Sequence, residues 1–400
     1  MTMLRTNPKP NAASRAGGFS LVELMVAMAI GLVLVLGMAS VYLFSKTAFS
    51  RQSQLSSIQQ GVRTAFEYLG NDARMVGHMG CFTGSAPTAA NFFNALSTTA
   101  MATNYAVGVE GYEFALTPTD NVYALGSDAP ADETDGAKWK TNAASGGISN
   151  ANMMTALGGG LTPGSDVLVI RTVTRGPVRL TADTTGTGSA LIIENISSGT
   201  CSTGTAKMSG FCAGSHGLIA SCNAARVFAV TSINAGTRTL TLPTGAFPVF
   251  AAGTAEVFPL QTIAYYVKRS SSGTTTSLYR RIFNGDPAPV GGVEQSDEQE
   301  LIQDIESLQL SYGVDTATVV GVVDSYKRAH EVTDWARVVA VRMGLLLRSS
   351  TVVAPGTSVS ASAPVNGVTV TYPSGSRYDR RVFTTTVAIR NKISYFPPSP

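Results

Sequence analysis

The sequence predicts an α+β protein in which one long N-terminal helix precedes a large β-rich, loop-rich domain. Three observations support this expectation. An uncharged apolar stretch near the N-terminus passes directly into a stretch with helical periodicity, and no proline interrupts either of them. The remaining chain alternates short β-branched runs with turn-forming residues, a pattern typical of strands joined by many loops. With 44% hydrophobic and 14% charged residues, most of the chain should fold.

The first 18 residues differ in charge from the rest of the chain. They contain Arg5, Lys9 and Arg15 and no acidic residue, so they account for the whole formal net charge of +3. Without them the chain holds 26 basic and 26 acidic residues. Nucleic-acid binding depends on neutralising phosphates, and a neutral chain argues against it. We therefore expect no nucleic-acid partner.

The apolar stretch that follows is long enough to cross a membrane. Residues 24–45 carry no charge, and a helix of that length covers about 33 Å. The preceding basic residues would stay in the cytoplasm under the positive-inside rule. Two alternatives remain open. One is a plain membrane anchor, and the other is a secretory signal peptide cut near Gly37, although the apolar core of such peptides is normally only about 7–15 residues long.

Glu23 distinguishes this stretch from an ordinary anchor. It lies at the start of the apolar run, where an unpaired carboxylate is costly and a cationic partner is expected. The next basic residue along the chain is Lys46, many helical turns away. Cleavage after Gly18 would create a positively charged amine on Phe19, four residues before Glu23.

Residues 18–23, Gly-Phe-Ser-Leu-Val-Glu, resemble the leader junction of type IV pilins and of the related type II secretion pseudopilins. In that family a prepilin peptidase cuts after the glycine and methylates the new N-terminus, and the glutamate pairs with the amine of a neighbouring subunit. The resemblance implies that Gly18 is the cleavage residue, Phe19 the methylated first residue and Glu23 the assembly carboxylate. It also implies three parts: a leader (1–18), a transmembrane and amphipathic helix (19–76) and a β-rich periplasmic domain (77–400).

The predicted helix continues beyond the apolar stretch. Its apolar residues recur every three or four positions, which is one stripe of an amphipathic helix; they are Leu55, Ile58, Val62, Phe66, Leu69, Ala73 and Val76. Gly77 and Gly80 are stop signals, so we expect a helix over residues 20–76. A coiled-coil stalk is one interpretation of the stripe. We favour packing against a sheet, as in pilins.

The remaining chain is predicted to be mostly β. Strand patterns occur near residues 167–170, 190–193, 226–233, 237–242, 255–267 and 277–283, and the strongest lie at 338–347 and 381–390. Residues 301–312 are expected to mix strand and turn. Residues 82–165, rich in Ala, Thr, Asn and Gly, are expected to form long loops with a few short strands.

Four segments narrow the resemblance to the PilW family of minor pilins: residues 71–81, 308–315, 340–348 and 387–391. Many PilW-like proteins follow the second segment with an acidic, calcium-loop-like stretch. Here residues 315–321 lack the regular Asp spacing that oxygen coordination needs, so we expect no metal there.

All four cysteines, Cys81, Cys201, Cys212 and Cys222, follow the membrane stretch. An exported domain favours disulfides, and four cysteines allow three pairings. Zinc is the alternative, but the spacings contain no C-x-x-C pair. The pairing that we favour is Cys201 with Cys212 and Cys81 with Cys222.

No catalytic constellation is apparent. The histidines His78, His216 and His330 lie far apart, and no nucleophile elbow, P-loop or dinucleotide motif occurs. Ser215 and His216 are interpreted as a polar turn inside a cystine loop. Four acids in residues 294–300 are interpreted as a solvated loop, with a docking or cation-binding surface as the alternative. We therefore expect no enzyme, no catalytic residues and no cofactor.

The resemblance implies a minor pilin that helps to prime pilus assembly near the filament tip, supporting twitching motility and adhesion. The implied partners are other minor pilins, the major pilin, the prepilin peptidase, the inner-membrane assembly platform and a PilY-type tip adhesin. The implied location is the inner membrane, with a single span and a periplasmic C-terminal domain, followed by incorporation into the pilus. Two alternatives stay open: a minor pseudopilin of a type II secretion system, and a membrane-anchored periplasmic binding module.

Overall fold

The computed structural model describes residues 18–82, 92–94, 96, 100–105, 107–114, 121–125, 136–142, 149–174, 176–245, 247–271, 273, 275–287, 294–316, 321–352 and 359–389. Residues 1–17 of the expected leader and residues 390–400, which contain three prolines, lie outside these residues. By its internal contacts the chain divides into two units, Met1–Leu55 and Ser56–Pro400, each of which is described by itself.

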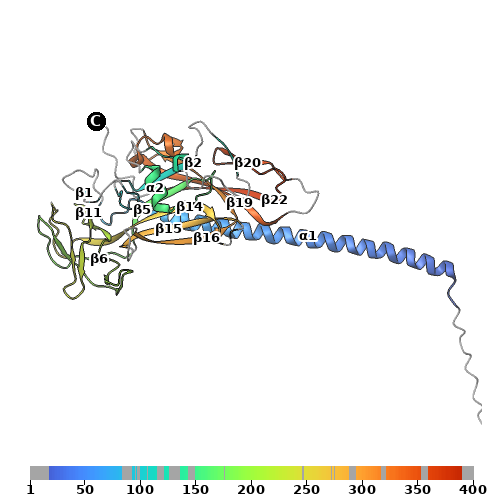
Figure 1. Cartoon of the computed structure of the whole chain (residues 1–400), viewed down its shortest axis with the longest axis horizontal. Helices are drawn as coiled ribbons and strands as arrows, with labels where there is room; N and C mark the ends of the chain where they lie inside the picture. Colours follow the sequence, from blue (N-terminus) through green and yellow to red (C-terminus); the bar gives the residue numbers. More distant parts are fainter. Residues whose placement is uncertain are drawn as a thin grey trace, which may run out of the picture. The chain divides into compact units, whose positions relative to one another are not determined.

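Helix α1 (Leu21–Arg74) is one continuous helix that begins in the first unit and ends in the second (Figure 1). It confirms the predicted helix to within two residues at each end. Neither Gly31 nor Gly37 interrupts it. Beyond Arg74 the chain turns, and Gly77 and Gly80 both have a positive φ, the conformation that glycine adopts most readily.

The second unit is built on two main β-sheets. The larger contains ten strands: β1 (Phe92–Asn94), β11 (Ala225–Ala229), β10 (His216–Ala220), β14 (Glu256–Arg269), β5 (Val167–Val173), β2 (Val109–Phe114) and β4 (Trp139–Lys140) in that order, with β15 (Thr276–Pro287), β16 (Glu294–Gln303) and β6 (Val178–Arg179) attached beside them. The smaller has the order β18 (Ser325–Lys327), β17 (Ile305–Val314), β19 (Val338–Val352) and β22 (Tyr378–Ala388), all antiparallel.

Smaller elements complete the described part of this unit. They are the sheets β12 (Ser232–Asn234), β13 (Thr239–Thr241), β7 (Ala190–Ile192) and β20 (Ser362–Val365), β21 (Val368–Thr371), β3 (Val122–Ala124), the hairpin β8 (Ser198–Thr200) and β9 (Ala206–Met208), helix α2 (Asn150–Leu157), and short 3-10 turns at Gly136–Lys138, Ala329–Glu331 and Trp335–Arg337. The α+β class expected from the sequence is therefore confirmed.

The second half of α1 packs on both sheets. Its buried apolar side chains are Ile58, Val62, Ala65, Leu69 and Ala73, which share one cluster with residues of β5, β14, β17 and β19. Burying one such aliphatic side chain stabilises the fold by about 1.5–3 kcal/mol. This packing excludes a free coiled-coil stalk for residues 56–74. The amphipathic stripe was thus correctly interpreted as the face that meets a sheet.

The central strand β5 is buried on both faces. In β5, Leu168 and Ile170 face the cluster that contains α1, whereas Val167 and Val169 face a second cluster that contains α2. The period-2 alternation of a strand explains this division. It also explains why the sequence of β5 is a continuous apolar run.

The chain passes from one sheet to the other at Asp304. This residue has φ 63° and separates β16, which pairs with β15, from β17, which pairs with β19. Residues 301–312 therefore do combine strand and turn, as expected. Between β5 and β14 the chain forms a separate cluster of buried side chains, which includes Phe211 and Leu240.

Most predicted strands are confirmed, and two expectations need correction. The segment 226–233 is two strands, because β11 ends at Ala229 and β12 starts at Ser232. Residues 82–165 were expected to hold only loops and short strands, but they include α2. The Ser149 hydroxyl accepts from the Asn152 N–H at the start of α2, and Gly158 ends it in the left-handed conformation.

Candidate assembly site

The start of α1 is organised by a reciprocal pair of hydrogen bonds. The Ser20 N–H donates to Glu23 Oε2 (3.3 Å), and the Glu23 N–H donates to Ser20 Oγ (3.4 Å). This is a capping box, and it satisfies two N–H groups that a helix start otherwise leaves unpaired. Leu24 N–H then donates to the Ser20 carbonyl (3.1 Å), the first bond of the helix. Ser20 and Glu23 therefore fix where the helix begins.

The Gly18–Phe19 junction, which precedes the capping box, is accessible. Phe19 is 86% exposed, and nothing lies within 4 Å of a Cβ built on Gly18. Glu23 is also exposed, and among the residues that the structure describes it forms no ion pair. The three residues Gly18, Phe19 and Glu23 thus lie together at one accessible helix start. One Glu23 oxygen meets the Ser20 N–H, which leaves the carboxylate charge available to a cation from outside the helix.

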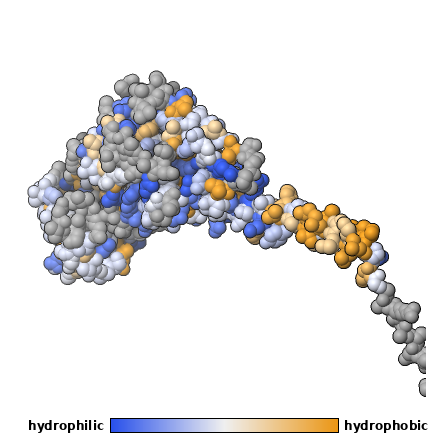
Figure 2. Space-filling view, turned by 45° about the vertical axis from the view of Figure 1, so that its right-hand side comes forward, coloured by the Kyte–Doolittle hydropathy of each residue, from blue (hydrophilic) through white to orange (hydrophobic). Residues whose placement is uncertain are grey.

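The first part of α1 is apolar on all sides. Its large side chains from Leu21 to Phe44 are exposed, and Figure 2 shows this segment as a continuous hydrophobic surface. The strongly apolar stretch of α1 has no buried residue. By length and composition the helix can cross a membrane, and an apolar solvent or neighbouring apolar helices would cover such a surface.

The far end of α1 is anchored by polar contacts in the second unit. Asp72 Oδ2 accepts from the Tyr265 hydroxyl (2.5 Å) and from Arg280 Nε (2.9 Å). Burial and the nearby Asp72 charge raise the pKa of the Tyr265 hydroxyl, so it stays a donor. The Thr172 hydroxyl donates to the Met75 carbonyl just past the helix (2.9 Å). These contacts connect the helix end to β14, β15 and β5.

Two disulfides lie in the part of the chain that follows α1. Cys81 is bonded to Cys222, with a Cα–Cα distance of 4.6 Å, and Cys201 is bonded to Cys212, with 6.0 Å. These are the two pairs that the sequence analysis favoured. The first joins the segment after α1 to the turn between β10 and β11. The second joins the residue that directly follows β8 to the segment after β9, in the chain between β5 and β14.

The three histidines are not brought together. His330 Nδ1 lies 2.7 Å from Glu113 Oε2, and burial together with Arg328 lowers the pKa of His330. His78 meets the Phe258 ring edge to face. His216 begins β10, so only the residues before it belong to the expected polar turn.

The candidate metal segment is described only in part, since residues 317–320 lie outside the described chain. The Gly321 N–H donates to Asp315 Oδ2 (2.5 Å), and the Thr316 N–H donates to Asp324 Oδ2 (2.6 Å). No group of three or more His, Cys, Asp or Glu side chains that could hold a metal occurs within the described residues. Of the acidic stretch 294–300, Glu298 contacts Lys268, and Glu300 accepts from Ser270, Ser271 and Ser277. These two carboxylates belong to β16 rather than to a loop.

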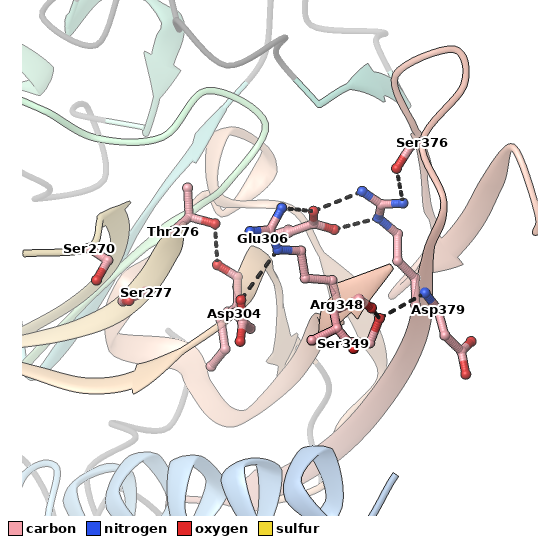
Figure 3. A network of polar contacts seen from close by, with 12 residues as sticks. Ser270, Thr276, Ser277, Asp304, Glu306, Arg348, Ser349, Ser376 and Asp379 are labelled. Carbon is pink, nitrogen blue, oxygen red and sulfur yellow. Dashed lines mark hydrogen bonds and ion pairs between the residues drawn. The ribbon is translucent and has the colours of Figure 1, made fainter. Parts of the chain in front are cut away.

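One polar cluster on the smaller sheet was not predicted from the sequence. Glu306 on β17 accepts two hydrogen bonds from Arg380 on β22, at 2.6 and 2.9 Å, and Arg348 on β19 donates to Asp304 (3.3 Å). Figure 3 shows Arg348 lying between Asp304 and Glu306. Each guanidinium also stacks on a tyrosine ring, Arg348 on Tyr378 and Arg380 on Tyr372, both at 4.3 Å. The paired residues are far apart in the chain, so no local sequence pattern predicts these contacts.

Two known family models match this chain, one near its N-terminus and one in its C-terminal part. Residues 13–39 match the prokaryotic N-terminal methylation motif, and residues 264–391 match the type IV pilus-assembly protein W family, PilW. No curated protein and no solved structure matches the chain.

The methylation motif includes Gly18, Phe19 and Glu23, and the PilW match runs from β14 through β22. Together with the apolar helix and the β-rich part, these matches support a type IV pilin-like protein. More particularly, they support a PilW-like minor pilin. Three of the four segments that suggested PilW lie inside the matched region, and residues 71–81 lie outside it.

Proposed function

We propose that the protein is made as a prepilin, cut between Gly18 and Phe19, and assembled into a type IV pilus as a minor subunit. In this proposal residues 1–18 are the leader, residues 19–76 anchor the chain in the inner membrane, and residues 77–400 form a periplasmic domain. The observation that carries the proposal is the helix start, where an exposed Gly18–Phe19 junction lies beside the carboxylate of Glu23.

Cleavage would place a cationic amine on Phe19, next to the capping box. A carboxylate inside an apolar helix bundle is stable only with a correctly placed cation. Pairing of Glu23 with the Phe19 amine of a neighbouring subunit would therefore set the axial register of the filament. Methylation of that amine keeps its positive charge. The chain then acts through assembly, and catalysis has no part in the proposal.

Within the filament system we propose a priming role shared with other minor pilins, near the tip and ahead of the major pilin. The PilW match supports this role over a plain anchor. Twitching motility and adhesion would then depend on the protein. Its partners would be the prepilin peptidase, the inner-membrane assembly platform and a PilY-type tip adhesin. A minor pseudopilin of a type II secretion system is the second candidate, since the helix start serves both systems.

The first test is the mature N-terminus. The chain is expressed with a prepilin peptidase, and its intact mass and first residue are determined. The expected product begins with N-methylated Phe19. A matched control omits the peptidase and should retain Met1 or Thr2. A chain that keeps its leader in the presence of the peptidase, or begins near Ser40, would contradict the proposal.

Deletion then separates the two filament systems. Loss of surface pili and twitching with normal protein secretion is expected for the pilin. Retained pili with lost secretion would identify a pseudopilin instead.

A further inference from the structure

A cavity of about 450 Å³ opens on the smaller sheet, on the face opposite to α1. Leu310, Tyr312, Val341 and Met343 point toward the helix, so the alternating Ser311 and Arg342 lie on the other face. The lining includes Tyr326, Lys327, Arg328, Arg342, Asn366 and Thr384. Three of these side chains are cationic, and the lining residues include no carboxylate.

Two of the three cations have no acidic partner among the residues that the structure describes. Arg342 stacks on the Tyr326 ring, with 3.7 Å from its guanidinium carbon to the ring centroid, and it forms no ion pair within the described residues. Lys327 is exposed and equally without an acidic partner there. Arg328 differs, since it contacts Glu113 and the Tyr123 hydroxyl. The stacking holds the Arg342 guanidinium in place before any ligand arrives.

Two neutral polar side chains of the cavity, Asn366 and Ser311, are already occupied by hydrogen bonds within the protein. Asn366 Nδ2 donates to the carbonyls of Gln309 and Arg342, both at 3.2 Å, and the Ser311 hydroxyl donates to Asn366 Oδ1 (3.3 Å). Few groups remain for the hydroxyls of a sugar ring. What the cavity offers is positive charge in a fixed position, which suits a carboxylate.

The cavity also reaches a strand edge. Thr384 lies in β22, which pairs with β19 along one side, and no described strand pairs with its other side. An unpaired edge of this length can accept a further strand. Alternate side chains of such a strand would point to the face on which Arg342 lies.

We propose that this cavity binds an aspartate or glutamate side chain from an extended segment of another protein subunit, paired with the open edge of β22. This contact lies in the β-rich unit and is separate from Glu23, so either can fail without the other. A second cavity of about 270 Å³, beside Tyr372 and Tyr378, is less suitable. There Arg380 is already held by Glu306.

The test uses the full mature chain in detergent and a fluorescein-labelled peptide, Thr-Val-Glu-Val-Thr, followed by fluorescence anisotropy. A matched peptide carries Gln in place of Glu. We expect the Gln peptide to bind about tenfold more weakly, and Arg342→Gln to weaken the Glu peptide by a similar factor. Arg179→Gln removes one exposed positive charge elsewhere and should change binding less than about twofold.

Two further measurements test the pairing with the β22 edge and the chemical class of the ligand. A Glu peptide with N-methylated backbone amides should bind about tenfold more weakly, because it cannot pair with β22. Arg342→Lys keeps the charge but loses the planar stacking, and should lie between wild type and Arg342→Gln. Equal binding of the Glu and Gln peptides, or unchanged binding by Arg342→Gln, would overturn the proposal. So would glucuronate binding tighter than the peptide, since that would mark a carbohydrate site.

Discussion

At the scale of single residues, Asp166 forms hydrogen bonds with the backbone of β17 that a neighbouring strand would otherwise form. Its carboxylate accepts the N–H groups of Leu310 on β17 (2.8 Å) and Phe114 on β2 (3.1 Å), and its own N–H donates to the Leu308 carbonyl (2.8 Å). The Leu308 N–H in turn donates to the Ser165 hydroxyl oxygen (3.0 Å). A short loop thus closes part of the β17 edge and joins the two main sheets.

Because Asp166 is buried, its proton affinity makes the stability of the fold depend on pH. Burial raises its pKa to about 7, although the two N–H donors act in the opposite direction. The folded state therefore holds the proton more tightly than the unfolded chain. The stabilising contribution is complete below the ordinary pKa of 3.8 and is lost as the pH rises through about 7.

We predict that the free energy of unfolding of wild type, relative to Asp166→Asn, falls between pH 4 and pH 8, by at most about 1.4 kcal/mol per unit. Urea unfolding of the mature chain in detergent, followed through the buried Trp139 and Trp335, measures this difference. Asp183→Asn is the matched control, because Asp183 also accepts a backbone N–H, from Ala252, at an exposed site. A relative stability that rises with pH would show that the N–H donors outweigh burial at Asp166.

At the scale of elements, the end of α1 is fixed twice. Asp72 in the last turn accepts hydrogen bonds from Tyr265 and Arg280, and Thr172 donates to the Met75 carbonyl directly after the helix. The Cys81–Cys222 disulfide then fixes the segment that follows. The two cystines differ in the length of chain they close, since the sequence separation is 141 for Cys81–Cys222 and 11 for Cys201–Cys212. In the entropic model the longer loop constrains the unfolded chain more.

We predict that replacing Cys81 and Cys222 together by Ser lowers the free energy of unfolding by about 5 kcal/mol, against about 3 kcal/mol for Cys201 and Cys212. Each double variant removes one bridge and leaves no free thiol, so each serves as the control for the other. Urea midpoints and limited proteolysis near residue 81 give the comparison. Equal losses, or a larger loss for the short loop, would mean that contacts rather than chain entropy determine the effect.

The elements that were predicted correctly are those with strong local signals. α1 has a continuous apolar stripe without proline, and β14, β15, β19 and β22 contain runs of β-branched, aromatic and aliphatic residues. What could not be predicted depends on residues far apart in the chain. Arg171 pairs with Glu110 across 61 positions, and Arg380 with Glu306 across 74. α2 was missed although its caps, Ser149 and Gly158, are visible in the sequence, because glycines and polar residues surround it.

The two candidate sites, the helix start and the cavity at Arg342, also differ in how far the sequence predicts them. Gly18, Phe19 and Glu23 lie within six consecutive residues, so a resemblance at the level of sequence is enough to propose them as site residues. The cavity at Arg342 is assembled from β17, β18, β19, β22 and the turn between β20 and β21. Nothing in the local sequence around Arg342 distinguishes it from an ordinary strand residue. Only the fold brings Lys327, Tyr326 and Thr384 to it.

At the scale of the whole molecule, the proposed function requires the helix start to do two different things. In the single chain, Glu23 caps α1 through the Ser20 N–H. In a filament it would pair with the cationic amine of a neighbouring subunit. A capping role needs only a hydrogen-bond acceptor, which Gln also supplies, whereas the filament role needs the negative charge. Substitutions at Ser20 and Glu23 therefore separate the two.

We predict that Glu23→Gln is processed and folded like wild type but enters sheared pili at least about tenfold less, because an uncharged amide leaves the neighbouring amine unpaired in an apolar bundle. Ser20→Ala is the matched control. It loses the hydroxyl cap, worth about 0.5–2 kcal/mol of helix stability, but keeps the charge, and should still enter pili. Immunoblots of sheared filaments, with the intact mass of the membrane-bound chain, give both readings. Normal entry of Glu23→Gln together with exclusion of Ser20→Ala would reverse the assignment and make capping, rather than charge, the contribution of this segment to assembly.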